Sequence, residues 1–142
     1  MKKLKYFIPM IIWMIFIFIM SHTDGNQSSL QSGFFVDLIS KIIKIDQELL
    51  SLMIRKAAHM SEYAFLALTV FYGLYQNKFN QKLLLPISLL ISFLYACSDE
   101  FHQLFIAGRS GQFIDVLIDT SGALIMIMII YWWLRRKKST SD

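Results

Sequence analysis

Four long apolar segments, separated by one long and two shorter links, dominate this sequence. They cover about residues 5–21, 57–75, 83–98 and 114–134. A helix needs about 20 apolar residues to cross the hydrocarbon core of a bilayer, with about 17–25 the usual range. The chain is also 56% hydrophobic, which is more than soluble domains usually are. We therefore predict an all-α fold, with one membrane domain over residues 1–142 and four transmembrane helices that form a bundle.

Basic residues mark one side of this predicted membrane protein. Lysines precede the first segment, Lys78 and Lys82 lie between the second and third segments, and residues 135–138 (RRKK) follow the fourth. Four crossings place all three clusters on one side, which the positive-inside rule makes the cytoplasmic one, together with both termini. Because the net charge of +4 comes mostly from these clusters, we expect the lipid bilayer as a partner and no nucleic acid. No small-x-small cleavage site follows the first segment, so we interpret it as a retained anchor.

The link between the first and second segments contains a further predicted helix, over about residues 34–53. Apolar residues recur there with helical spacing, while Asp37, Lys41, Lys44 and Glu48 follow one another at intervals of three or four. This pattern is typical of an amphipathic helix with a charged stripe. We expect this helix to lie in the outer membrane interface or to pack as a lid on the helix ends.

Ionisable residues gather where this topology faces outward. RKAAHMSEY (55–63) opens the second segment, SDEFHQ (98–103) closes the third, Arg109 lies in the outer turn, and IDVLIDTSG (114–122) opens the fourth. A charged side chain at the centre of a membrane helix costs about 2.5–3.5 kcal/mol on insertion scales, and such residues are functional candidates by default. We therefore predict a polar site that opens toward the outer leaflet.

Helical spacing predicts which of these side chains meet. Residues at i, i+4 and i+7 share one face of a helix. If the third helix continues through residue 103, Asp99 shares a face with His102 and Gln103, while Glu100 points elsewhere. The other two helices each present one polar face, made of Arg55, His59 and Glu62 on the second and of Asp115, Asp119 and Gly122 on the fourth.

These residue types suit the binding of an anionic group and proton transfer. Arginine binds phosphate or carboxylate through paired hydrogen bonds, and a histidine beside a carboxylate is a common general acid/base pair. Two histidines with acidic residues could also hold a divalent metal, so the cofactor stays open. We predict catalytic residues at His59, Glu62, Asp99, Glu100, His102, Asp115 and Asp119, and substrate-binding residues at Arg55, Lys56, Gln103 and Arg109.

Structural interpretations compete with these functional ones. Lys56 could be an interfacial anchor that reaches the headgroups, and the aspartates of the fourth helix could form ion pairs with Arg55 and Arg109 that fix helix packing. His22 lies in a polar link, where we expect it to be solvated. A purely structural purpose explains poorly why histidines and acidic residues gather at one end, so we favour a functional site.

The three motifs, in this order across four membrane helices, resemble the VanZ-like family. Its pattern R-K-x-x-H-x-x-E-Y is filled by residues 55–63, D-E-x-H-Q-x-F-x-x-x-R by residues 99–109, and D-x-x-x-D-x-x-G by residues 115–122. The resemblance implies a multi-pass protein of the bacterial cytoplasmic membrane. The family's namesake is associated with resistance to teicoplanin.

We therefore expect a cell-envelope protein that binds, and in an enzymatic version modifies, an anionic lipid or a lipid-linked cell-wall intermediate. An ion- or proton-coupled transporter or flippase is an alternative, since the same charges would line a path. A non-catalytic membrane protein that binds glycopeptide or a partner protein is another. The sequence does not indicate an oligomeric state.

Overall fold

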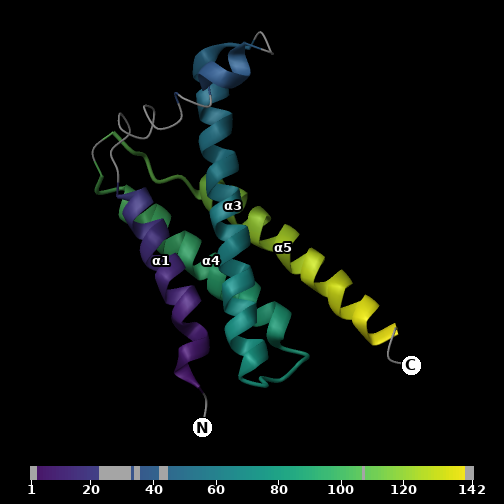
Figure 1. The fold of residues 1–142 in the computed structure, drawn as a ribbon. Helices are drawn as coiled ribbons and strands as arrows, with labels where there is room; N and C mark the ends of the chain where they lie inside the picture. The colour runs from purple at the N-terminus through teal and green to yellow at the C-terminus, as the bar shows by residue number, and fades with distance from the viewer. Residues whose placement is uncertain (1–2, 23–32, 34–35, 42–44, 107, 140–142) are drawn as a thin grey trace.

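The described part of the chain contains helices and no strand (Figure 1). The computed structural model describes residues 3–22, 33, 36–41, 45–106 and 108–139. Within them, a short 3-10 helix η1 (Leu4–Phe7) leads into α1 (Ile8–Ser21), and three long helices follow, α3 (Gln47–Gln76), α4 (Leu84–Gln103) and α5 (Phe113–Ser139). The predicted all-α class is confirmed for these residues.

Three of the four predicted membrane segments coincide with helices that are long and apolar enough to cross a membrane. In the described part of the chain these are Leu4–Ser21, Leu84–Gln103 and Phe113–Lys137. The segment predicted at 57–75 lies within α3, which does not meet the same criteria of length and composition. The structure therefore supports three helices of spanning character, where the sequence predicted four.

Helix α3 lies at the centre of the fold and contacts η1, α1, α4 and α5, most extensively α5. The side chains of Tyr63, Leu66, Ala67 and Val70 are completely buried along it. A helix shielded by its neighbours can carry polar residues that would be costly against lipid. This position explains why α3 is less uniformly apolar than the helices around it.

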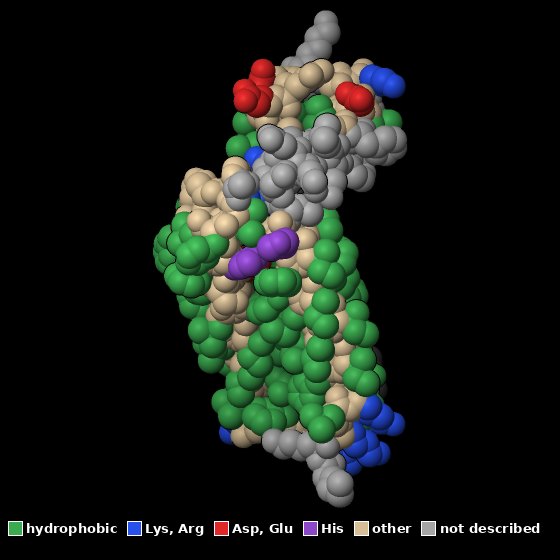
Figure 2. Space-filling view, turned by 90° about the vertical axis from the view of Figure 1, so that its left-hand side faces the viewer, with side chains coloured by type: hydrophobic (Ala, Val, Ile, Leu, Met, Phe, Trp, Pro, Cys, Tyr) green, Lys and Arg blue, Asp and Glu red, His purple; other side chains and the backbone are tan. Residues whose placement is uncertain are grey.

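The outer surface of the helices is apolar over a broad region. On α1, Ile12 and Ile19 are 60% and 58% exposed, and on α5 Ile129 is 56% exposed. Figure 2 shows hydrophobic side chains covering most of one face, with Lys and Arg at its lower end. Monomeric soluble proteins rarely expose a continuous apolar surface of this size. The surface is suited to contact with a lipid bilayer.

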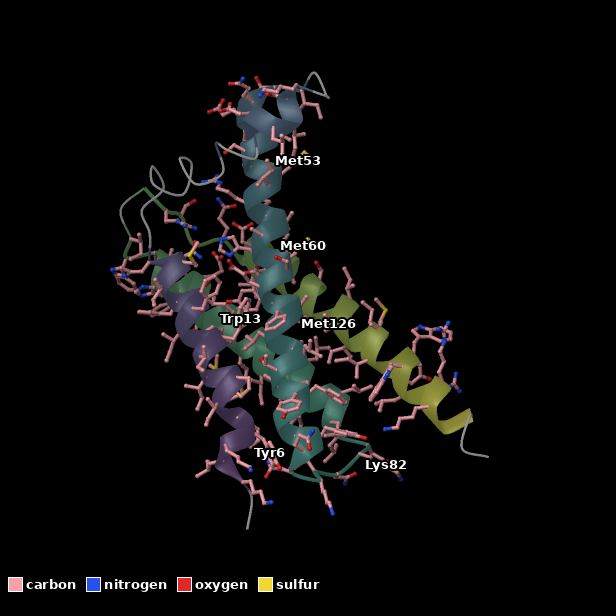
Figure 3. All side chains as sticks on the ribbon, viewed as in Figure 1. Tyr6, Trp13, Met53, Met60, Lys82 and Met126 are labelled. Atoms are coloured by element: carbon pink, nitrogen blue, oxygen red, sulfur yellow. The ribbon has the colours of Figure 1, made fainter. Side chains whose placement is uncertain are left out.

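Both chain termini lie at the same end of the molecule as the link between α3 and α4 (Figure 1). Figure 3 places Tyr6 and Lys82 at that end, whereas Met60 and Met53 lie progressively farther from it along α3. The basic clusters that the sequence assigned to one side are thus at one end of the structure. Helix α3 extends past the ends of α1 and α4 at the opposite end (Figure 1).

The amphipathic helix predicted over residues 34–53 is not one continuous helix. Asp46 has a non-helical backbone, and its carboxylate accepts hydrogen bonds from the backbone N–H groups of Glu48 and Leu49, both at 3.0 Å. This is the geometry of an N-cap, which begins a new helix. Residues 47–53 therefore form the first turns of α3. Residues 34–35 and 42–44 lie outside the described residues.

Gly122 allows α5 to approach α3 closely. A Cβ atom at this position would lie 2.7 Å from the carbonyl carbon of Met60, so no larger residue fits without moving the helices apart. We predict that Gly122→Leu lowers the free energy of unfolding by about 1–3 kcal/mol or more, because 1–3 kcal/mol is the usual cost of overpacking. Leucine is a good helix former, so helix propensity would not be the cause.

Thermal unfolding of the detergent-solubilised protein measures this effect. Gly33→Leu is the matched control, because no atom of the described residues lies within 4 Å of a Cβ atom at position 33. Equal melting temperatures for the two variants would show that the contact between α3 and α5 at Gly122 is not tight.

Candidate functional site

A polar cavity of about 380 Å³ lies between α3, the C-terminal end of α4, the link that follows it and the start of α5. Oxygen and nitrogen atoms gather beside α3 near the level of Met60 (Figure 3). The lining combines basic, acidic, amide and hydroxyl side chains with one histidine. Its residues are Leu52, Arg55, Lys56, His59, Glu100, Gln103, Gly108, Arg109, Ser110, Gln112, Asp115, Ile118 and Asp119.

Two helix faces meet across this polar cavity. On α3, Arg55, Lys56 and His59 lie on adjacent turns of one face, and on α5 Asp115 and Asp119 are one turn apart. The structure thus brings together residues that are about 60 positions apart in sequence, as the helical spacing predicted.

Basic side chains approach the cavity from α3 and from the link between α4 and α5. Lys56 pairs with Asp115, so it is not the isolated interfacial anchor that the sequence allowed. Gly108, the residue before Arg109, has a left-handed backbone conformation with φ of 72°. Glycine adopts this conformation without steric strain, so the chain can turn just before Arg109. Burial, and secondarily the like charge of Arg55, lower the pKa of Arg109. An arginine keeps its charge despite such a shift. The carboxylates of Asp99, Glu100 and Glu62 act on the same pKa in the opposite direction, so Arg109 lies among charges of both signs.

Acidic side chains are more deeply buried than the basic ones. Glu100 is 6% exposed, and its carboxylate accepts a hydrogen bond of 2.9 Å from the backbone N–H of Gln112. Asp119 is 1% exposed, and its Oδ2 has no hydrogen-bond partner among the described residues. A buried carboxylate oxygen without a partner is costly, so Asp119 is suited to accept a hydrogen bond from a ligand or a water molecule.

A buried hydrogen-bonded chain fixes the wall of the cavity on α4. Gln103 donates from Nε2 to the Ser21 hydroxyl at 2.9 Å and to the Asp99 carboxylate at 3.3 Å. All three residues are at most 5% exposed. Asp99 does not line the cavity, so it supports Gln103 rather than facing the cavity itself. These hydrogen bonds also connect Ser21, the last residue of α1, to the site.

His59 lies beside Glu62 one turn farther along α3. The His59 Nδ1 and the Glu62 Oε2 are 3.5 Å apart, and the two side chains are 21% and 13% exposed. This separation is long for a hydrogen bond, although such bonds in unliganded sites often tighten when substrate binds. His59 lines the cavity and Glu62 lies outside its lining, so the carboxylate is placed to orient the imidazole.

The prediction for the end of α4 holds for Asp99 and Gln103, which are hydrogen-bonded, but it was wrong about which of Glu100 and His102 faces the site. Glu100 lines the polar cavity, whereas His102 points away from it. Successive helical residues are about 100° apart, so Gln103 lies between Asp99 and Glu100 around the helix, and His102 lies on the far side of Asp99.

His102 instead contacts the end of α1. Its Nε2 is 3.2 Å from the Nδ1 of His22, and its ring lies 4.8 Å from that of Phe18. Figure 2 shows two histidine side chains side by side on the surface. The expectation that His22 is merely solvated is therefore wrong, because it forms a contact between α1 and α4.

The described side chains do not form the metal site that the sequence left open. No group of three or more His, Cys, Asp and Glu residues in the described ranges is arranged to hold a metal ion. Asp115 is paired with Lys56, and Glu100 is held by the backbone of Gln112. This donor set does not fit a divalent metal.

Three contributors to the site were not predicted from the sequence. Ser21 ends an apolar segment, and a buried polar residue at that position gave only a weak signal. Gln112 contributes its backbone N–H, which has no signal in sequence. Trp13 lies within the first apolar segment, and its indole N–H donates to the carbonyl of Glu62 at 2.8 Å.

The family assignment follows from a comparison that covers the entire site. The family model described as VanZ/LLP1 matches residues 6–135. The chain belongs to the VanZ/LLP1 family. The match includes every helix that lines the polar cavity, in agreement with the resemblance found in the motifs. No curated protein and no solved structure matches this VanZ/LLP1 chain.

Removal of the Gln103 amide should destabilise this VanZ/LLP1 fold. Gln103→Leu leaves the buried Asp99 and Ser21 side chains without their shared donor. Loss of a buried partner costs about 1–3 kcal/mol, and more where a charged group is left behind. We expect a lower melting temperature in detergent for this variant.

Gln112→Leu is the matched control, because the Gln112 side chain is exposed and bonds only to Ser110 in the described structure. Surface substitutions of this kind usually change stability by less than about 0.5 kcal/mol. A Gln103 variant as stable as the Gln112 variant would contradict a structural role for the chain between α1 and α4.

Proposed function

We propose that this protein is a four-helix membrane protein of the bacterial cell envelope, and that its polar cavity binds the anionic headgroup of a lipid or of a lipid-linked cell-wall intermediate. The observation that carries the proposal is the polar cavity itself, whose lining includes Arg55, Lys56 and Arg109 together with His59. Its volume of about 380 Å³ lies within the range of about 300–1,000 Å³ that is typical of small-molecule sites.

In this proposal α3 is the fourth spanning helix. Its neighbours bury one face of it over residues 63–74, so this part needs less hydrophobicity than an isolated span. Four crossings place the basic ends of the chain in the cytoplasm and the polar cavity toward the outer leaflet of the cytoplasmic membrane. Membrane-anchored cell-wall intermediates are exposed at that surface.

An anionic group between Arg55 and Arg109 would relieve the repulsion between their charges. The guanidinium groups offer paired N–H donors that match phosphate or carboxylate oxygens. The membrane would hold the apolar part of the same lipid beside the exposed apolar surface of the helices. The polar cavity and the surrounding apolar surface therefore fit a ligand that is charged at one end only.

His59 is our candidate for proton transfer. A neutral imidazole would accept a proton from a substrate hydroxyl or from water, and Glu62 would stabilise the imidazolium that forms. Asp119 would accept a hydrogen bond from the same substrate. His102 is placed outside this reaction, because it faces His22 rather than the polar cavity.

A transport path through one chain has less support. In the described parts of the helices beyond the polar cavity, Thr69, Ser88 and Ser92 are buried polar residues whose hydroxyl groups bond backbone carbonyls of their own helices. Such bonds satisfy the hydroxyls locally and do not form a relay.

Binding of an anionic lipid tests the proposal directly. We predict that Arg109→Gln weakens binding of a polyprenyl phosphate at least about tenfold, since hydrogen bonds to charged groups contribute about 1.5–3 kcal/mol. Arg109→Lys should bind with intermediate affinity, because lysine keeps the charge and loses the paired donors. Binding to protein in nanodiscs, with the uncharged polyprenol as the reference ligand, gives both values.

Arg136→Gln is the control for nonspecific charge, because Arg136 lies on α5 near the C-terminus and outside the polar cavity. Equal loss in the Arg109 and Arg136 variants would contradict a binding role for the cavity. His59→Ala separates binding from modification, since it should retain lipid binding and lose lipid turnover and any teicoplanin resistance of the strain. Full turnover in a well-folded His59→Ala variant would leave only the binding role.

The proposed topology predicts opposite accessibility for two positions at the ends of α4. In a Cys97→Ser background, Ser110→Cys should react with a membrane-impermeant thiol reagent in intact cells, and Lys78→Cys only after permeabilisation. Both residues are exposed in the structure, so burial would not mask the result. Labelling of both from the same side would contradict an α4 that crosses the membrane.

A further inference from the structure

A second cavity, of about 590 Å³, lies at the end of the molecule that carries the termini. It is formed by the last turn of α3, the link to α4, the first turn of α4 and the C-terminal part of α5. Figure 3 places Lys82, one of its lining residues, at this end, far from Met60 beside the polar cavity. We call it the basal cavity.

The charged lining of the basal cavity is entirely basic. Lys82, Arg135 and Lys137 contribute to it, and no acidic residue does in the part of the chain that the structure describes. Two of these cations lie over aromatic rings, the Arg135 guanidinium 5.4 Å from the centre of Tyr131 and the Lys137 ammonium 5.3 Å from that of Trp133. Aromatic rings do not neutralise positive charge, so the basal cavity attracts anions.

The rest of the basal cavity is mostly apolar, with Gln81 and two tyrosines, Tyr75 and Tyr131, as its other polar members. Leu84, Leu85 and Pro86 contribute from α4, and Leu134 contributes from α5. Beside this wall, Leu83 and Trp132 are 44% and 60% exposed on the surface that faces lipid in a spanning arrangement. The basal cavity therefore joins a cationic rim to an apolar groove that is continuous with the membrane-facing surface.

We propose that the basal cavity binds an anionic phospholipid from the leaflet on the side of the chain termini. The phosphate lies between Lys82 and Arg135, and an acyl chain lies along the wall formed by Leu84 and Leu134. Basic pockets between membrane helices bind anionic lipid headgroups in this way. Tyrosine and tryptophan beside the rim, here Tyr131 and Trp132, are typical of the depth at which headgroups lie.

Charge favours a lipid over a second copy of this chain in the basal cavity. A symmetric dimer through this face would bring the same cations of both copies together, and like charges at an interface cost several kcal/mol. A soluble anion would satisfy the cations and leave the apolar wall uncovered. A phospholipid satisfies both parts of the lining.

Native mass spectrometry of the full chain in detergent tests the proposal. We expect one phosphatidylglycerol to bind in preference to phosphatidylcholine with the same acyl chains. Lys82→Gln and Arg135→Gln should each weaken phosphatidylglycerol binding about fivefold, since a basic residue near an anionic membrane surface contributes about 1 kcal/mol. Arg135→Lys should retain most of the binding.

Two neighbouring substitutions are matched controls. Lys78 lies in the same link as Lys82, and Arg136 follows Arg135 on α5, but neither lines the basal cavity. Lys78→Gln and Arg136→Gln should therefore bind phosphatidylglycerol like the unmodified protein. Melting temperatures within a few degrees of the unmodified protein establish that each variant is folded. If Arg135→Gln is not folded by this criterion, the test of the proposal rests on comparing phosphatidylglycerol binding of Lys82→Gln with that of Lys78→Gln.

Three results would overturn the proposal. Equal losses in all four glutamine variants would indicate diffuse surface charge, and equal binding of the two phospholipids would remove the anion preference. A dimer whose formation excludes phosphatidylglycerol would assign the basal cavity to a second copy of the chain. Polyprenyl phosphate binding at the polar cavity should not change in Lys82→Gln, so failure of this proposal is distinguishable from failure of the function proposed above.

Discussion

The close contact between α3 and α5 at Gly122 is the constraint on which the polar cavity depends. Met60, which touches Gly122, follows His59 directly, and Asp119 lies less than one turn before Gly122. The contact therefore fixes the separation between the polar faces of the two helices just beside the site. A wider separation would admit more water to Asp119 and would weaken the pairing of Lys56 with Asp115. The geometry of the site is thus a consequence of helix packing, and one residue without a side chain permits it.

Helical spacing alone determines which residues of one helix lie together, and it predicted Arg55 with His59 on α3 and Asp115 with Asp119 on α5, all of which line the polar cavity. Glu62, predicted on the same face of α3, lies outside the lining. The same argument failed at the end of α4, where Asp99, Glu100, His102 and Gln103 are spread over an arc of about 160° around the helix. Which part of that arc faces the cavity depends on where α1 and α5 pack. Helical spacing contains no information about that packing, so the prediction placed His102, rather than Glu100, on the face of α4 that lines the cavity.

The fold was predicted best where each helix faces lipid. For α1, α4 and α5, the bilayer requires apolar residues, and composition reveals the span. Helix α3 is shielded by its neighbours, so its composition reports burial in protein rather than exposure to lipid. The break at Asp46 had a local signal, since aspartate is a favoured N-cap, but the helical periodicity continues across it and concealed the boundary.

The two cavities differ in how their charges are balanced, and this difference separates their proposed roles. The polar cavity is lined by three basic residues, Arg55, Lys56 and Arg109, and three acidic ones, Glu100, Asp115 and Asp119. Its charges can balance within the chain, so a ligand can leave without exposing a large net charge. Among the described residues, the basal cavity has three basic residues and no acidic one in its lining, so an external anion would balance this charge. A cavity whose charges are neutralised within the chain suits a site where ligands exchange. A cavity whose positive charge is neutralised by a bound anion suits a permanently bound lipid that anchors the helices at one depth in the membrane.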